Sequence, residues 1–215
     1  NRLDSDRRCY AFFHPRMPDE PLIFVEVALV RGLAGSVQAL LDEDAPVLDP
    51  RAADTAIFYS ISNCQQGLAG ISFGNFLIKR VVEELSAEFR SLKTFATLSP
   101  LPGFRRWLDA CLLAGEPGLL TDEEITSLRS ALPAESGALA LAGILAKPQW
   151  WTNVALRKTT EPVLVRLCAR YLLTEVNGKR ARDPVAHFHL SNGARVERLN
   201  MAGDTSDKGS RESAT

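Results

Sequence analysis

The chain has 215 residues, of which 46% are hydrophobic, enough to bury a full core as one large domain or a domain with a lobe. Its 25 basic and 26 acidic residues are interspersed and leave a net charge of −1, which argues against a nucleic-acid-binding or membrane-surface protein. The longest apolar stretches, such as 22–30, are too short to span a bilayer.

The first predicted element is a β-hairpin. Its strands, 9–15 and 20–30, are rich in β-branched and aromatic residues and are joined by turn-forming residues. A short amphipathic helix is predicted over 34–45, followed by a loop. The next strand, 55–62, has a continuous apolar centre, which is typical of a sheet covered on both faces.

A glycine-rich loop with Gly67, Gly70 and Gly74 connects that strand to an amphipathic helix ending near Phe89, and a further strand follows over 92–100. Glycines let the backbone approach phosphate oxygens, and the free N–H groups of a helix start bind anions. The loop is therefore either a pyrophosphate cradle or a plain strand–helix connection. Its spacing excludes a nucleotide-hydrolase P-loop and the dinucleotide fingerprint.

The second half of the chain is mostly helical. Thr121 and Glu124 form a capping box that opens a helix. The stretch 183–200 predicts a hairpin, since apolar and polar residues alternate on both sides of Ser-Asn-Gly-Ala. The polar stretch 203–215 predicts disorder. Other helices are expected over three ranges: 104–114, around 136–146 and 161–175.

Ser99 and two histidines are the candidate chemical groups. Ser99 ends the strand that follows the glycine-loop helix, so it should lie near the same sheet edge as the loop. A Ser before Pro is also a common turn former, and no G-x-S-x-G elbow surrounds it, so an acyl-enzyme hydrolase is not indicated. His187 and His189 fall on one face of the predicted strand, but no carboxylate or cysteine at ligand spacing favours a metal.

The cysteines favour a reducing compartment. They lie far apart and show no C-x-x-C spacing, so reduced thiols in a cytosol-like compartment are expected instead of disulfides or a zinc site. They are Cys9, Cys64, Cys111 and Cys168. The order of strands and helices around one core predicts an α/β or α+β class with a mixed sheet.

Several blocks, in this order, resemble the malonyl-CoA decarboxylase family over roughly residues 7–200. They are RRCYAFFHP, EPLIFVEVAL, FYSIS-x-x-QQGL-x-G, FLIKRVV, LSP-x-PGF and DPVA-x-FHL-x-NGA. The resemblance implies a GNAT-like mixed sheet flanked by helices, with a helical insertion before the C-terminal hairpin. It implies one catalytic domain over 1–202, and assigns Ser99 and His189 as the catalytic pair, with His187 structural. The implied malonyl-CoA-binding loop is Ala69, Gly70, Ile71, Ser72, Phe73, Gly74 and Asn75.

The resemblance implies a lyase that converts malonyl-CoA to acetyl-CoA and CO₂ through a thioester enolate protonated by a histidine, without metal or cofactor. It implies no nucleic-acid or membrane partner. It also implies a homo-oligomer formed through an N-terminal helical domain that is missing from this chain. The expected compartment is the bacterial cytoplasm, or mitochondria or peroxisomes in a eukaryote.

The chain departs from the family at several points. Animal relatives carry an acidic residue where this chain has Ser72, and family members continue beyond 200 into further sheet and helix. The literal GNAT loop pattern is also absent. A CoA-dependent N-acyltransferase and a non-catalytic acyl-CoA-binding module remain the alternatives.

Overall fold

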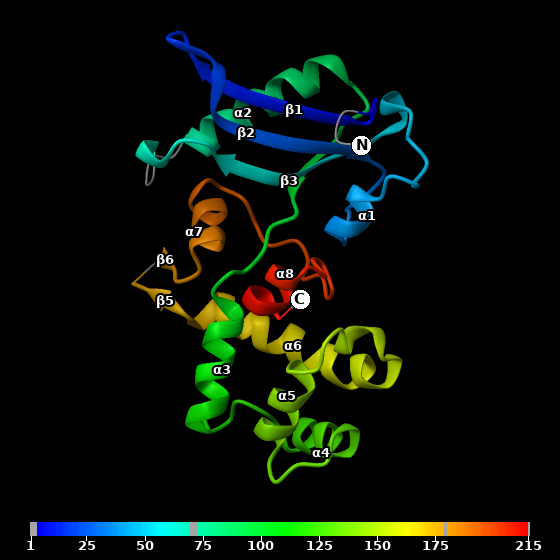
Figure 1. Cartoon of the computed structure of the whole chain (residues 1–215), viewed down its shortest axis with the longest axis vertical. Helices are drawn as coiled ribbons and strands as arrows, with labels where there is room; N and C mark the ends of the chain where they lie inside the picture. The colour runs from blue at the N-terminus through cyan, green and yellow to red at the C-terminus, as the bar shows by residue number, and fades with distance from the viewer. Residues whose placement is uncertain (1–3, 69–72, 179, 215) are drawn as a thin grey trace. The chain divides into compact units, whose positions relative to one another are not determined.

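The computed structural model describes residues 4–68, 73–178 and 180–214, and the chain divides into two compact units, Asn1–Ser99 and Pro100–Thr215. In Figure 1 the first unit runs from blue to green and the second from green to red. Each unit has its own hydrophobic core. Within the described ranges, no helix has the length and apolar content needed to cross a bilayer.

The first unit is built on a four-stranded sheet with the order β1-β2-β3-β4. All neighbouring strands pair antiparallel except β3 and β4, which are parallel. Parallel neighbours need a crossover connection, and helix α2, Phe73–Glu88, provides it. The mixed sheet is therefore as predicted, but β4 is shorter than the predicted strand over 92–100. The strands are β1 Arg7–His14, β2 Met17–Val30, β3 Thr55–Asn63 and β4 Thr94–Thr97.

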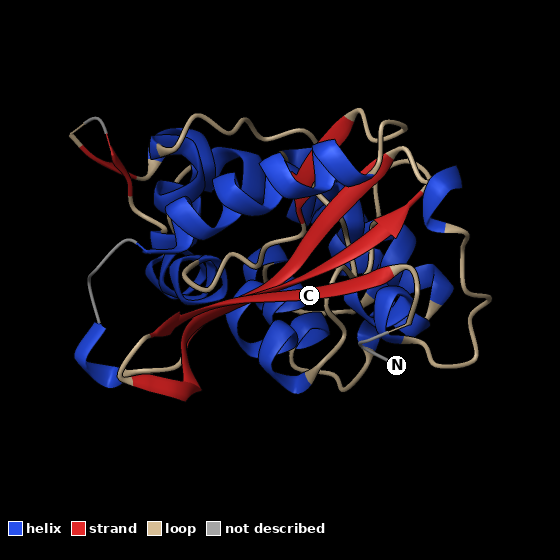
Figure 2. Cartoon of the chain, turned by 90° about the horizontal axis from the view of Figure 1, so that it is seen from above, coloured by secondary structure: helices blue, strands red, loops and turns tan. Residues whose placement is uncertain are grey.

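Both faces of this sheet are covered. Val25 and Val27 of β2 are buried on the face where α2 lies, together with Leu77 and Val81 of the helix. Figure 1 shows α2 along this face, and Figure 2 shows the same strands in red from above. The opposite face carries a smaller cluster of Ala28, Leu40 and Ile57. The apolar centre of β3 predicted this two-sided burial correctly.

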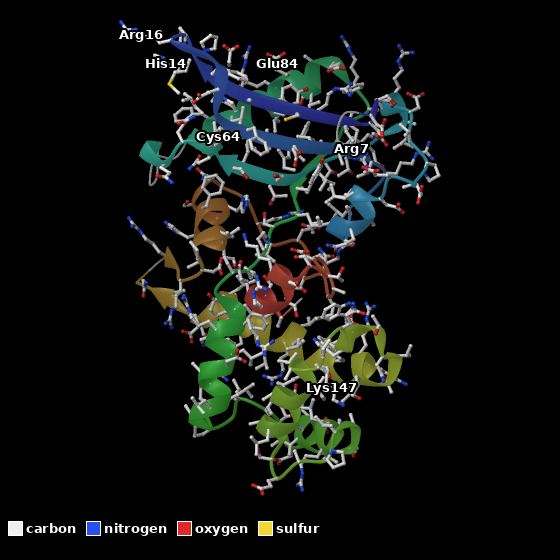
Figure 3. The ribbon with its side chains drawn as sticks, viewed as in Figure 1. Arg7, His14, Arg16, Cys64, Glu84 and Lys147 are labelled. Carbon is white, nitrogen blue, oxygen red and sulfur yellow. The ribbon has the colours of Figure 1, made fainter. Side chains whose placement is uncertain are left out.

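Helix α1 is shorter than predicted and spans only Val37–Leu41. It ends where Asp42 turns to extended backbone and its side chain accepts a hydrogen bond from the N–H of Asp44 at 3.0 Å. Such a local side-chain bond offers the backbone an alternative to helix. Arg7, labelled in Figure 3, donates to the carbonyl of Leu40 at 2.9 Å and so holds the helix end against β1.

The second unit is a cluster of helices, and the predicted helix over 104–114 is observed with the same bounds. The capping box is also confirmed. The N–H of Glu124 donates to the Thr121 hydroxyl at 3.2 Å, and the Glu124 carboxylate accepts from the N–H of Thr121 at 2.9 Å. The main helices are α3 Phe104–Ala114, α4 Asp122–Ala131, α5 Gly137–Leu145 and α6 Val154–Thr174.

Helix α6 begins before the predicted start at 161. Asn153 caps it by accepting from the N–H of Leu156 at 3.1 Å, and the helix continues past Pro162. A proline inside a helix removes one backbone donor, but Pro162 is exposed and buried residues such as Val163 and Leu164 follow it directly. Tertiary burial of this stretch therefore outweighs the local proline signal.

The predicted hairpin over 183–200 is wrong. Residues Pro184–Ser191 form helix α7, and no strand occurs in 192–200. A short hairpin of β5 Val176–Asn177 and β6 Arg180–Ala181 precedes the helix. The polar stretch 203–215 also differs from the predicted disorder, because Asp207–Ser213 form helix α8.

Candidate active site

Ser99 lies just beyond the carboxyl end of strand β4. Thr97 is opposite Phe58 in the parallel pairing of β3 with β4. The N–H of Leu98 then donates to the Phe58 carbonyl at 2.9 Å, so regular pairing extends to the residue before Ser99. The sheet thus fixes the backbone that leads into Ser99, which is the last residue of the first unit.

A β-bulge lies in β3 beside this strand end. Val27 pairs with Phe58, whereas its neighbour Glu26 pairs with Ser60, so Tyr59 is the extra residue. Bulges bend a strand and occur often next to active sites. The bulge in β3 lies next to the last residue pair between β3 and β4. The carboxyl ends of these parallel strands are therefore the candidate site in the first unit.

The glycine-rich loop follows the carboxyl end of β3 in the sequence. Cys64, labelled in Figure 3, comes directly after β3. Strand β3 continues five residues past its last pairing with β4, to Asn63. At about 3.3 Å per residue, it reaches roughly 17 Å beyond the end of β4. Ligands of open sheets with helical crossovers bind at the carboxyl ends of the strands.

Of the predicted binding loop, Ala69, Gly70, Ile71 and Ser72 lie outside the described residues. The other three, Phe73, Gly74 and Asn75, form the first turn of α2, and Gly74 is buried there. N–H groups in a first turn have no partner within their own helix and can bind an anion. The end of the predicted loop is therefore the N-terminus of helix α2.

His189 belongs to helix α7 of the second unit. At about 100° per residue, positions 187 and 189 are separated by about 200° around a helix, so His187 and His189 do not share a face as they would on a strand. The ring of Phe188 lies edge-on to the His189 imidazole, with centroids 5.0 Å apart. Burial lowers the pKa of His189 below its ordinary value, which favours the neutral imidazole.

The two ends of α7 carry sequence signals that are typical of helix ends. Asp183 is the N-cap and Pro184 the first helical residue, the position that proline prefers. At the other end Gly193 has φ +86°, its N–H donates to the carbonyl of Leu190, and the N–H of Ala194 donates to that of His189. This is a Schellman motif. Reading Asp-Pro as a start and Asn-Gly as a stop would have found the helix.

The second unit also contains Asp183, a buried carboxylate that no sequence motif predicted as a site residue. Its side chain is buried and accepts from the N–H of Gly103 at 3.0 Å and from the Tyr171 hydroxyl at 3.4 Å. Burial and the Asp183 carboxylate raise the pKa of Tyr171 to about 12, so this phenol stays protonated at neutral pH.

No metal centre is evident in the described part of the chain, where no three His, Cys, Asp or Glu side chains are grouped to hold an ion. The four cysteines are free thiols. Burial is the main cause that raises the pKa of Cys111 and of Cys168 to about 12, so neither is a thiolate nucleophile at neutral pH.

Comparison with known proteins identifies the relatives of this chain. Residues 1–215 match the family model described as "Malonyl-CoA decarboxylase C-terminal domain". Mitochondrial malonyl-CoA decarboxylases of Anser anser anser and Mus musculus are each 41% identical over 215 residues. The alignments cover 97% of this chain but only 42% and 44% of those relatives, so the chain spans less than half of their length.

Solved structures that resemble this chain are also malonyl-CoA decarboxylases. The malonyl-CoA decarboxylase of Rhodopseudomonas palustris is 46% identical with a TM-score of 0.83, covering 99% of this chain and 46% of that one. The Agrobacterium vitis enzyme is also 46% identical, with a TM-score of 0.82 and coverage of 98% and 48%. At this identity, both sequence and fold are shared.

Proposed function

Because the chain belongs to the malonyl-CoA decarboxylase family, we propose that it carries the site that converts malonyl-CoA to acetyl-CoA and CO₂. The observation that supports this most directly is the family match over all 215 residues. The catalytic motifs lie inside that match, LSP-x-PGF around Ser99 and FHL-x-NGA around His189.

In the proposed reaction, the bond between the malonyl α-carbon and its carboxylate breaks and CO₂ leaves. The electron pair remains on the α-carbon and is delocalised onto the thioester oxygen as an enolate. A proton then adds to the α-carbon and gives acetyl-CoA. The thioester carbonyl is the electron sink, so this chemistry asks the protein only to orient the carboxylate, stabilise the oxyanion and deliver the proton.

We assign the proton delivery to His189, since a protonated imidazole can act as a general acid. Ser99 would orient the malonyl carboxylate by a hydrogen bond. The first turn of α2, with Phe73, Gly74 and Asn75, would bind the pyrophosphate of coenzyme A together with the preceding residues of the loop. Its place after a central strand supports this assignment.

The finer features of the family are proposed in the same way. They are the GNAT relationship of the sheet, the single catalytic domain over 1–202 and a homo-oligomer formed through an N-terminal helical domain. The parallel β3–α2–β4 crossover supports the first of these, because it puts a helix start next to the strand ends.

One assay separates this function from its alternatives. Purified protein is incubated with malonyl-CoA alone, and with acetyl-CoA in the presence and absence of amines. We expect acetyl-CoA and CO₂ from malonyl-CoA without any acceptor. Free CoA that appears only with an amine would indicate an N-acyltransferase instead, and binding without turnover would indicate a non-catalytic acyl-CoA module.

A further inference from the structure

One buried carboxylate connects the parts of two motifs that lie in the second unit. Asp183 begins the DPVA-x-FHL motif, and Gly103 belongs to the LSP-x-PGF motif 80 residues earlier. The side chain of Asp183 is only 2% exposed. An ionised group at such a depth is costly unless each of its oxygens is hydrogen-bonded.

Each oxygen of the carboxylate serves a different segment. Oδ1 accepts from the N–H groups of Val185 and Ala186, at 3.0 and 3.1 Å, and so caps α7. Oδ2 accepts from the N–H of Gly103 at 3.0 Å and from the Tyr171 hydroxyl at 3.4 Å. The carboxylate therefore bonds to the turn before α3, to α6 and to the first turn of α7.

The packing around Gly103 leaves no room for a side chain at this position. A Cβ built on Gly103 would lie 2.3 Å from the Tyr171 hydroxyl oxygen and 3.2 Å from Oδ2 of Asp183. A second hydrogen bond holds the same turn: the N–H of Leu101 donates to the Ser213 hydroxyl at 3.2 Å. The turn that directly follows Ser99 in the sequence is thus bonded on both sides.

We propose that Asp183 is a positioning residue, which holds the 101–103 turn after Ser99 and the helix that carries His189 in one fixed arrangement within the second unit. This inference rests on the proposed decarboxylase function. Asp183 acts through the two segments and not on the substrate. Because misplacement of a catalytic group by about 1 Å can cost roughly 10²-fold in rate, loss of the connection should lower turnover.

Asp183→Ser separates the two roles of the side chain. Serine is a good helix cap, so α7 keeps its N-cap, but its single short hydroxyl cannot also reach Gly103. Asn153→Ala is the matched control, because it removes the cap of α6 and leaves Asp183 untouched. The readouts are kcat and KM for malonyl-CoA, the melting temperature and hydrogen exchange of the segment around Gly103.

For Asp183→Ser we expect kcat to fall by about 10²-fold with KM changed much less, and faster amide exchange around Gly103. Asn153→Ala should lower the melting temperature and keep kcat. Wild-type kcat in Asp183→Ser, unchanged exchange at Gly103, or an equal loss of kcat in Asn153→Ala would each overturn the inference. If Asp183→Ser does not fold, Asp183→Asn tests the same bond, since an amide nitrogen that faces Gly103 cannot accept from its N–H.

The decarboxylase function and the role of Asp183 can be tested separately. A wild-type protein that releases no CO₂ from malonyl-CoA would overturn the decarboxylase assignment and, with it, the catalytic part of the inference. The structural connection would then be decided by hydrogen exchange alone, because the Gly103 bond does not depend on turnover.

Discussion

The buried carboxylate of Asp183 accepts a hydrogen bond from the backbone N–H of Gly103 at 3.0 Å, across 80 residues of sequence. The Tyr171 hydroxyl donates to the same oxygen, so three segments of the second unit meet there. Gly103 has ordinary backbone angles, with φ −92°. It is therefore space, and not backbone conformation, that requires a glycine at this position.

Gly103→Ala should destabilise the second unit, because the new Cβ would meet the Tyr171 hydroxyl. Overpacking of a tight site costs about 1–3 kcal/mol, measured by urea or thermal unfolding. Adding Tyr171→Phe removes the hydroxyl and should recover part of the loss. Gly67→Ala is the control, because its Cβ would have nothing within 4 Å. Equal stability of Gly103→Ala and wild type would contradict the tight packing.

His189→Asn should lower kcat by roughly 10²–10⁴, the usual contribution of general acid–base catalysis, with KM changed much less. Asparagine keeps a polar group of similar size but has no titrating proton. His187→Asn is the control and should keep most of the activity, because on helix α7 the two side chains leave different faces. A dead His187 variant beside a normal His189 variant would reverse the assignment.

Ser99→Ala should also reduce mainly kcat, because a hydrogen bond that orients the reacting groups is made most fully in the transition state. If Ser99 and His189 act as a unit, the double variant should lose less activity than the product of the two single losses. Steady-state kinetics of the four proteins checks this. Strictly multiplicative losses would show that the two residues act independently.

The pH dependence should report the protonation state of His189. As the acid that delivers the proton, His189 must be an imidazolium, and burial lowers its pKa below the ordinary histidine value of 6.5. The catalytically competent form is therefore lost as pH rises through that lowered pKa, so kcat/KM should fall with a midpoint below 6.5. His189→Asn should lack this limb. A kcat/KM that rises over the same range would argue that His189 acts as a base.

The C-terminal helix α8 should contribute to stability. A Cβ on Gly209 would lie 2.1 Å from the Asp204 carbonyl oxygen, so Gly209→Ala should lower the free energy of unfolding by about 1–3 kcal/mol. Limited proteolysis should leave the stretch 203–214 intact in wild type and cut it in the variant. Rapid cleavage of this stretch in both proteins would support the disorder expected from its composition.

Local patterns predicted the elements whose cause is local. The run 55–62 is apolar and β-branched, and it is strand β3 to within one residue. The predicted bounds of helix α3 match the observed ones. Its apolar residues recur at helical spacing, and a glycine follows its last residue. The capping box at Thr121 needs only four residues to form, so it too could be predicted.

Tertiary contacts decided the rest. The alternation around His187 and His189 fits a strand as well as a short helix, and the helix is observed where the buried Asp183 bonds to Gly103 as well as capping α7. Helix α8 has little apolar content, yet Ser213 accepts from Leu101 and Ala214 is buried. The bond between Asp183 and Gly103 and the bond between Ser213 and Leu101 each join residues 80 or more positions apart. The free energy of these bonds depends on chain segments that a local pattern does not contain.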